Sequence, residues 1–330
     1  MQKASSPKYY LLIFIILALA IVGIAGVYLI NFSPLRDTIS NLSYTPPSEV
    51  TTLEEKLTLT DPAKTTFRAT RPALETQSSF NDHCRSHDAE ISVLGCYTDG
   101  HIYIYNITEP KLSGIVESTA AHELLHAAWD RLSESDKSTV STYLNQVYSE
   151  HHEELSKDLA IYDDADQLDE LHSRIGTQIA DLPDYLETYY ARYFTNQDTI
   201  VAYYNNYSTP FNELKSQMES LKSDLDDLKS TIDSETSKYY SRSDTLTKAI
   251  EEFNSCAKSP GCFATTTEFN ARRNELVDEQ NDLGELYNHI NSAVESYNQK
   301  VNEYNNSILR TEELQNAMNS NVQPTETIAP

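Results

Sequence analysis

Hydrophobic and polar residues follow different periods in different parts of the chain. Residues 9–30 form an unbroken apolar run, and about 20 such residues suffice for a helix to cross the hydrocarbon core of a bilayer. Beyond residue 211, apolar side chains recur at intervals of three and four, which is typical of a coiled coil. The pattern predicts an N-terminal transmembrane helix, a globular middle region and two long C-terminal helices.

The middle region, residues 62–210, mixes short strand patterns with helical ones and is of a size expected for one domain. Residues 65–70 alternate weakly like a strand, whereas residues 72–80 are expected to be helical. Three further helices are predicted later in this region, over residues 134–155, 166–177 and 184–194.

A β-hairpin is predicted ahead of the middle of this domain. Residues 90–97 and 101–107 are rich in β-branched and aromatic side chains, and Asp99-Gly100 between them is a strong turn signal. Together with the helices, this hairpin predicts a mainly α domain with a small sheet.

The two long helices are expected to fold back on one another over residues 211–315. Cys256 and Cys262 enclose a Pro-Gly reversal, so a disulfide would close the tip of an antiparallel coiled-coil hairpin. The alternative is two separate parallel coiled coils in a homodimer. Residues 316–330 are predicted to be a disordered tail.

The segments around the apolar run set the predicted topology. Lys3 and Lys8 precede it and acidic residues outnumber basic ones after it, so residues 1–30 are expected to be a cytoplasmic N-terminus with a single-pass anchor in the cell membrane. Residues 31–61 are rich in Thr, Ser and Pro, which predicts a stalk that leads to an extracytoplasmic domain. A cleaved signal peptide is the alternative, but the run is longer than a typical signal-peptide core.

Cysteine usage agrees with an oxidising compartment. Of the three ways to pair four cysteines, the simplest is two local disulfides, Cys84 with Cys96 and Cys256 with Cys262. His83 and His87 flank Cys84, so a small zinc knuckle is a second, less favoured interpretation.

The chain is strongly acidic, with 50 acidic against 25 basic residues and a formal net charge of −25. This balance disfavours nucleic acid and anionic lipid as partners. With only 8 glycines, the chain also contains no glycine-rich phosphate loop.

The candidate chemistry lies in the segment His122-Glu123-Leu124-Leu125-His126. Two histidines four apart on a helix project from one face about one turn apart, so both imidazoles can bind the same ion. Glu123 lies beside the position left open for water, which is the H-E-x-x-H arrangement of zinc hydrolases.

The flanking residues Thr119, Ala120, Ala121, Ala127 and Ala128 are helix-compatible and uncharged, as a buried active helix requires. With them, residues 94–194, about a third of the chain, resemble the zincin metallopeptidases of the gluzincin type. The metzincin pattern is absent, because Trp129 stands where it would need glycine. The resemblance implies an α+β zincin-like fold, a Zn²⁺ cofactor and a peptide or protein substrate.

The same resemblance implies a mechanism and a third ligand. Zinc would activate a water molecule, and Glu123 would take its proton and pass it to the leaving amine. Gluzincins take a glutamate from a later helix, and Glu170 is the best candidate; its alternative role is a surface pair with Arg174. Other carboxylates and histidines stay open as ligands, namely Glu187, Glu153, Glu154, Asp130, His151 and His152.

The resemblance also implies a side chain that donates to the oxyanion and a strand that binds substrate. His172 is a candidate catalytic donor to the oxyanion, but on a regular helix it would point away from Glu170, so this role needs a non-helical backbone. Tyr189, Tyr190 and Tyr193 compete for the role. Residues 102–105 are a candidate rim strand that pairs with extended substrate, or else a core strand.

The sequence therefore predicts a membrane-anchored, extracytoplasmic zinc metallopeptidase whose coiled-coil arm recruits a protein partner. Two alternatives stay open: an inert zincin-like platform in a coiled-coil interaction protein, and a zinc-dependent peptidoglycan peptidase.

Overall fold

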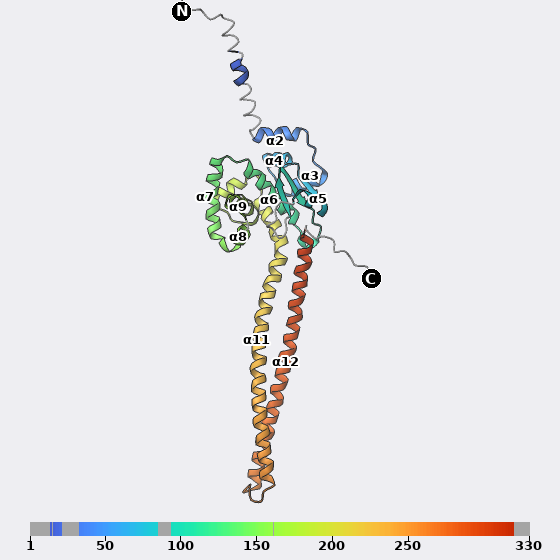
Figure 1. Cartoon of the computed structure of the whole chain (residues 1–330), viewed down its shortest axis with the longest axis vertical. Helices are drawn as coiled ribbons and strands as arrows, with labels where there is room; N and C mark the ends of the chain where they lie inside the picture. Colours follow the sequence, from blue (N-terminus) through green and yellow to red (C-terminus); the bar gives the residue numbers. More distant parts are fainter. Residues whose placement is uncertain (1–13, 15, 22–32, 85–93, 161, 320–330) are drawn as a thin grey trace, which may run out of the picture. The chain divides into compact units, whose positions relative to one another are not determined.

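A computed structural model describes residues 14, 16–21, 33–84, 94–160 and 162–319. The chain divides into two compact units, Met1–Pro210 with Leu314–Pro330, and Phe211–Glu313 (Figure 1). The division at Pro210 coincides with the change from mixed to heptad periodicity in the sequence, although the backbone is helical on both sides of it.

The first unit is mainly helical with a small three-stranded sheet, in agreement with the predicted fold class. Its elements, in chain order, are α2 (Ser33–Leu42), α3 (Ser48–Lys56), α4 (Asp61–Ala69), β1 (Ala73–Glu75), α5 (Gln77–His83), β2 (Gly95–Thr98), β3 (His101–Tyr105), η1 (Pro110–Leu112), α6 (Ile115–Asp130), α7 (Glu134–Glu150), α8 (His152–Leu159), α9 (Asp164–Gln178) and α10 (Asp184–Tyr190).

The predicted β-hairpin is confirmed. β2 and β3 pair antiparallel, with Thr98 opposite His101, and both turn residues, Asp99 and Gly100, have positive φ (51° and 78°) as a tight two-residue hairpin turn requires. The strand order is β1-β3-β2. β3 is therefore the central strand, and residues 102–105 form a core strand rather than a free rim.

The strand predicted over residues 65–70 was wrong, and the helix predicted over residues 72–80 was right only for residues 77–80, which lie in α5. Residues 65–70, expected to be a strand, lie largely within α4, and β1 lies inside the stretch expected to be helical and pairs parallel with β3. The α4 helix forms because Thr60 accepts a hydrogen bond from the Ala63 N–H at its start, and because Ala63 and Phe67, four apart, are both buried. These contacts outweigh the β preference of the threonines.

Residues 33–61 pack into the first unit and do not form the predicted stalk. Val50, Leu53 and Leu57 belong to the main hydrophobic core. Glu54, which is 2% exposed, accepts two hydrogen bonds from Arg68 of α4, at 2.7 and 2.6 Å. A short helix was expected around residues 49–59, but the Ser, Thr and Pro content of the segment gave no sign that its apolar face is buried in the domain.

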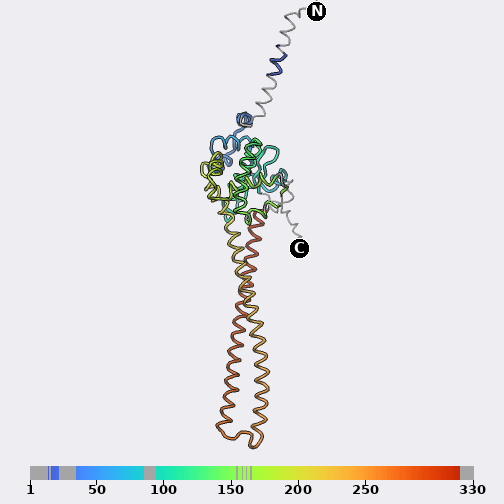
Figure 2. Tube along the Cα trace, turned by 90° about the vertical axis from the view of Figure 1, so that its left-hand side faces the viewer, coloured from blue at the N-terminus to red at the C-terminus, as the bar shows by residue number. Residues whose placement is uncertain are grey.

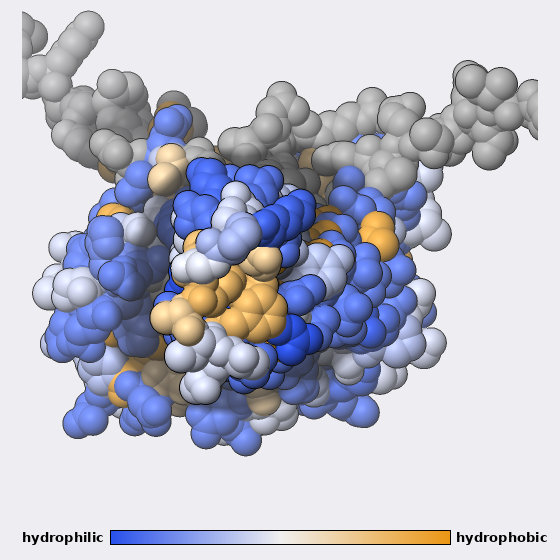
Figure 3. All heavy atoms as spheres, turned by 90° about the horizontal axis from the view of Figure 1, so that it is seen from below, coloured by the Kyte–Doolittle hydropathy of each residue, from blue (hydrophilic) through white to orange (hydrophobic). Residues whose placement is uncertain are grey.

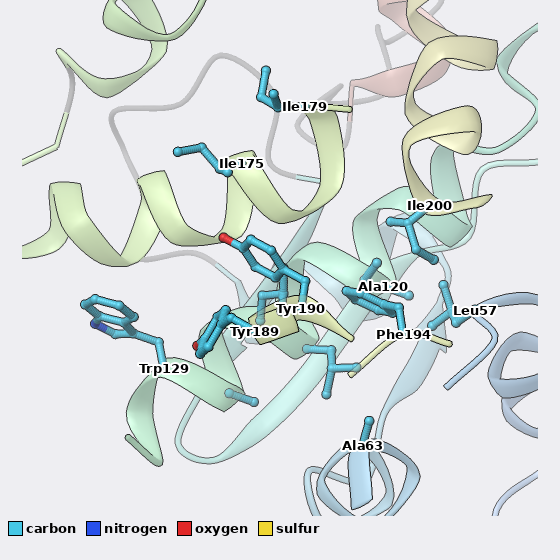
Figure 4. Packing of buried hydrophobic residues seen from close by; sticks show 14 of the residues in the cluster. Leu57, Ala63, Ala120, Trp129, Ile175, Ile179, Tyr189, Tyr190, Phe194 and Ile200 are labelled. Carbon is cyan, nitrogen blue, oxygen red and sulfur yellow. The ribbon is translucent and has the colours of Figure 1, made fainter. Parts of the chain in front are cut away.

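The core surrounds α6. Small side chains of this helix, including Ala120 and Ala127, are completely buried, which lets neighbouring helices approach closely. Figure 4 shows Tyr189 and Tyr190 packed between α6 and α9, with Trp129 at the end of the cluster. Helix α6, which contains the H-E-x-x-H segment, is therefore buried inside the first unit.

The disulfide between Cys84 and Cys96 is confirmed, with Cα atoms 6.0 Å apart. It links the C-terminus of α5 to β2. Because the thiol of Cys84 is used in this bond, it is not available for the zinc knuckle; His87 lies outside the described residues.

The predicted membrane helix, residues 9–30, lies mostly outside the described residues, which include only Phe14 and residues 16–21 of it. Among the helices of the described part of the chain, none is long and apolar enough to cross a bilayer.

The second unit is an antiparallel helical hairpin made by the parts of α11 (Gln197–Ala257) and α12 (Thr266–Met318) that lie within residues 211–313, and these helices lie side by side in Figure 2. Arg242 pairs with Glu279 at 2.7 Å, and Lys300 with Asp224 at 2.6 Å, so partners later in α12 lie earlier in α11. The disulfide Cys256–Cys262 closes the turn. The predicted antiparallel hairpin is therefore confirmed over the alternative of two separate parallel coiled coils.

Candidate metal centre

The two motif histidines lie on one face of α6. Their Nε2 atoms are 3.0 Å apart, and each side chain keeps a small exposed fraction, 19% for His122 and 18% for His126. Helical spacing of four residues fixes this approach, because side chains one turn apart project from the same face. The pair is accessible although its helix is buried.

The carboxylate of Glu170 completes a three-membered group. Its Oε2 lies 3.5 Å from Nε2 of His122 and 3.4 Å from Nε2 of His126. Tetrahedral zinc with bonds of about 2.0–2.2 Å separates its ligand atoms by roughly 3.3 Å, so the three observed separations match one ion. His122, His126 and Glu170 therefore form a group that could hold a metal ion.

Glu170 contacts both the motif histidines and Arg174, which the sequence had suggested as alternative partners. Its Oε1 accepts a hydrogen bond from Nε of Arg174, while Oε2 faces the histidines. Burial raises the pKa of this carboxyl, but the charge of His122, hydrogen bonds from both histidines and the charge of Arg174 outweigh burial and hold the pKa well below its usual range. The side chain is thus an ionised acceptor inside the protein.

Asp169 fixes the orientation of His126. Its Oδ1 lies 2.8 Å from Nδ1 of His126, which can donate to the carboxylate and so direct Nε2 at Glu170. Burial opposes a charge on this ring, but the pKa of His126 is raised by Asp169 and Glu170. At His122, burial lowers the pKa.

Asp169 was not predicted as a site residue. Asp169 precedes the candidate ligand directly, and an acidic pair on one helix turn was the only local signal. Whether its carboxylate meets His126 depends on how α9 packs against α6, which no local pattern specifies.

Glu123 is a buried carboxylate next to this group. It is 5% exposed, and its charge contributes to the raised pKa of His126. Gly95, the first residue of β2, packs against it: a Cβ on Gly95 would lie 2.8 Å from Oε1 and 2.6 Å from a methyl of Thr119. Only glycine at this position leaves room for the Glu123 carboxylate. Gly95 was not predicted as a site residue.

The structure does not bring His172 to the group. α9 is helical throughout, so the condition for an oxyanion role is not met, and His172 is completely buried with Nε2 2.9 Å from the hydroxyl of Tyr189. Burial lowers the pKa of its imidazole well below the usual value. The hydroxyl of Tyr190 donates to the His172 carbonyl, so this part of α9 is packed core.

Four of the other candidate ligands lie elsewhere. Glu187 and Glu153 are exposed, Asp130 accepts a hydrogen bond from the hydroxyl of Tyr97 at 3.1 Å, and the ring of His152 contacts Tyr148. Over the described ranges, the two histidines and Glu170 are the sole group of three metal-ligating side chains this close together.

Comparisons with protein-family models, with curated proteins and with solved structures found no match to this chain.

Proposed function

We propose that the chain is a zinc-dependent peptidase anchored to a membrane by residues 9–30. The observation that carries the proposal is the convergence of two imidazole nitrogens and one ionised carboxylate oxygen beside a buried glutamate. Three protein ligands and an open fourth position are the usual arrangement of catalytic zinc.

A bound cation explains the group better than hydrogen bonding does. The two Nε2 atoms face each other and both approach the same carboxylate oxygen. A proton on either ring can satisfy one such approach, whereas one dication accepts all three lone pairs at once. Two neutral imidazoles and one carboxylate leave a dication with a net charge of +1.

The neighbouring residues suit hydrolysis. A zinc ion supplies a Lewis acid that polarises a carbonyl and lowers the pKa of a water molecule. We assign Glu123 as the general base that takes the proton of this water and returns it to the leaving amine. Asp169 and Arg174 keep His126 and Glu170 in their ligating orientations.

The edge strand β2 is the candidate for binding an extended substrate. Among the described strands, β2 pairs with β3 alone, so its second edge has no strand partner there. Gly95 places the start of this edge beside Glu123. A peptide that added to β2 would therefore present its carbonyls next to the base.

The hairpin supports a role in recruiting a protein partner. Phe253, Phe263 and Phe269 gather at its closed end, with ring centroids 5.0–5.4 Å apart. Figure 3, which looks at this end, shows an apolar patch surrounded by hydrophilic residues. Such a patch is typical of a contact surface.

The substitution Glu123→Gln tests the proposal. We expect the purified chain to keep its zinc and to lose hydrolysis of a fluorogenic library of unstructured peptides, because an amide cannot accept the proton. The control is Glu117→Gln on the same helix, whose carboxylate pairs with Lys56 at 2.6 Å. Equal turnover in the two variants would remove Glu123 from the base role, and a zinc-loaded wild type without any hydrolysis would favour the inert platform.

A further inference from the structure

Helix α2 presents its polar side to the domain. Asp37, which is 3% exposed, accepts hydrogen bonds from Nε and Nη2 of Arg131 at 2.7 and 3.0 Å. Ser40 donates to the carbonyl of Ala69 at 3.4 Å, and Asn41 to that of Thr65 at 3.1 Å. The helix is therefore attached through hydrogen bonds and an ion pair.

The apolar side of α2 points away from the domain. Leu35, Ile39 and Leu42 are spaced four and three residues apart and share one face. Ile39 is 53% exposed, Leu42 is 84% exposed, and Leu35 is half-buried. A helix at a water-facing surface normally has the opposite arrangement, with apolar residues inside.

The position of this helix in the chain indicates what covers the apolar stripe of Leu35, Ile39 and Leu42. Only two residues separate the end of the apolar run, at Ile30, from the start of α2 at Ser33. If residues 9–30 cross a bilayer, α2 begins within about 10 Å of the end of the membrane helix. We propose that this apolar stripe docks α2 on the lipid interface, with its axis in the plane of the membrane.

Exposed Arg36 beside the stripe suits this location, because a guanidinium can pair with lipid phosphate. The stripe itself needs no anionic lipid, which agrees with the acidic character of the chain. The inference rests on the membrane anchoring included in the proposed function, but it does not depend on hydrolysis.

Docking of α2 would set the orientation of the metal helix towards the membrane. Arg131, which holds Asp37 of α2, also donates from Nη1 to the carbonyl of Ala127 at 2.6 Å, one residue after His126. It further contacts the hydroxyl of Tyr97 on β2 at 3.3 Å. One half-buried arginine thus connects α2 to α6, which carries Glu123, and to β2, which packs against Glu123.

Nitroxide labels on the full chain in phosphatidylcholine nanodiscs test the docking. The four native cysteines form the two disulfides, so Ile39→Cys or Leu42→Cys adds a single reactive thiol. Thr142→Cys, at an exposed position of α7, is the matched control. We expect labels at positions 39 and 42 to collide with oxygen more often than with a nickel chelate. The label at position 142 should collide more often with the chelate.

Each other outcome is informative. A chain that enters the discs but shows water-like collisions at positions 39 and 42 would overturn the docking and leave the peptidase proposal intact. Dipolar broadening between labels, with low collision rates for both oxygen and the nickel chelate, would instead identify a second copy as the occupant, which also overturns it. A chain that does not enter the discs would overturn both the anchor and the docking, while zinc content and hydrolysis would still report on the metal centre.

Discussion

At the residue scale, the site depends on contacts between elements as much as on the H-E-x-x-H motif. His122, Glu123 and His126 were predictable because their geometry is local to one helix. Asp169 and Gly95 were not, because each acts across an interface, with α6 in both cases. Glu170 was proposed from a family resemblance, and the structure places it beside the histidines.

Asp169 should tune metal affinity without binding the metal. We expect Asp169→Asn to weaken zinc binding by about 10–100-fold, because the orienting partner of a ligand histidine typically contributes that much. A competition titration with a chromogenic chelator measures it. Glu187→Gln, an exposed carboxylate on α10, is the control, and equal affinity in the two variants would contradict the role of Asp169.

Gly95 should be required for the position of Glu123. In Gly95→Ala, the added methyl would displace the Glu123 carboxylate, and we expect turnover of the peptide library to fall by up to about 100-fold, the usual effect of a misplacement near 1 Å. Zinc content should not change. Gly284→Ala is the control, since its Cβ meets no atom within 4 Å; a Gly95→Ala enzyme as active as this control would show that the contact does not position the base.

At the element scale, the success of sequence reasoning depended on how local each signal was. The β2–β3 hairpin was predicted correctly because its turn chemistry lies in two adjacent residues. The α4 and β1 predictions failed because weak local alternation was overridden by burial of Phe67 and by pairing with β3, a strand far along the chain. His172 was misplaced for a related reason: a polar residue within a predicted helix gave no sign of the tyrosine cluster that buries it.

The α3 helix offers a direct test of the revised domain boundary. We expect Leu53→Ala to lower the free energy of unfolding by about 2–5 kcal/mol, because it removes a side chain that is 3% exposed in the main core. The unfolding transition of the first unit in chemical denaturation measures this change in free energy. Glu55→Ala, exposed on the same helix, should have little effect, and a similarly small effect of Leu53→Ala would restore the stalk interpretation.

At the scale of the whole molecule, two units with different compositions serve different parts of the proposed function. The first unit contains the group that could hold a metal ion and the helix α2 that we propose docks on the membrane, and the second is a disulfide-closed hairpin with an aromatic end. The heptad pattern predicted the hairpin well, because long-range pairing there repeats one local rule over many turns. The predicted membrane helix lies mostly outside the described residues, so its test is the nanodisc experiment.

The central claim is that His122, His126 and Glu170 bind one metal ion, and zinc content measured by elemental analysis tests it most directly. We expect about one zinc per chain in the wild type and in Glu187→Gln, and loss of most of this zinc in Glu170→Gln, because a neutral amide replaces the charged ligand. A wild-type chain without zinc, or equal zinc in Glu170→Gln and Glu187→Gln, would contradict the account.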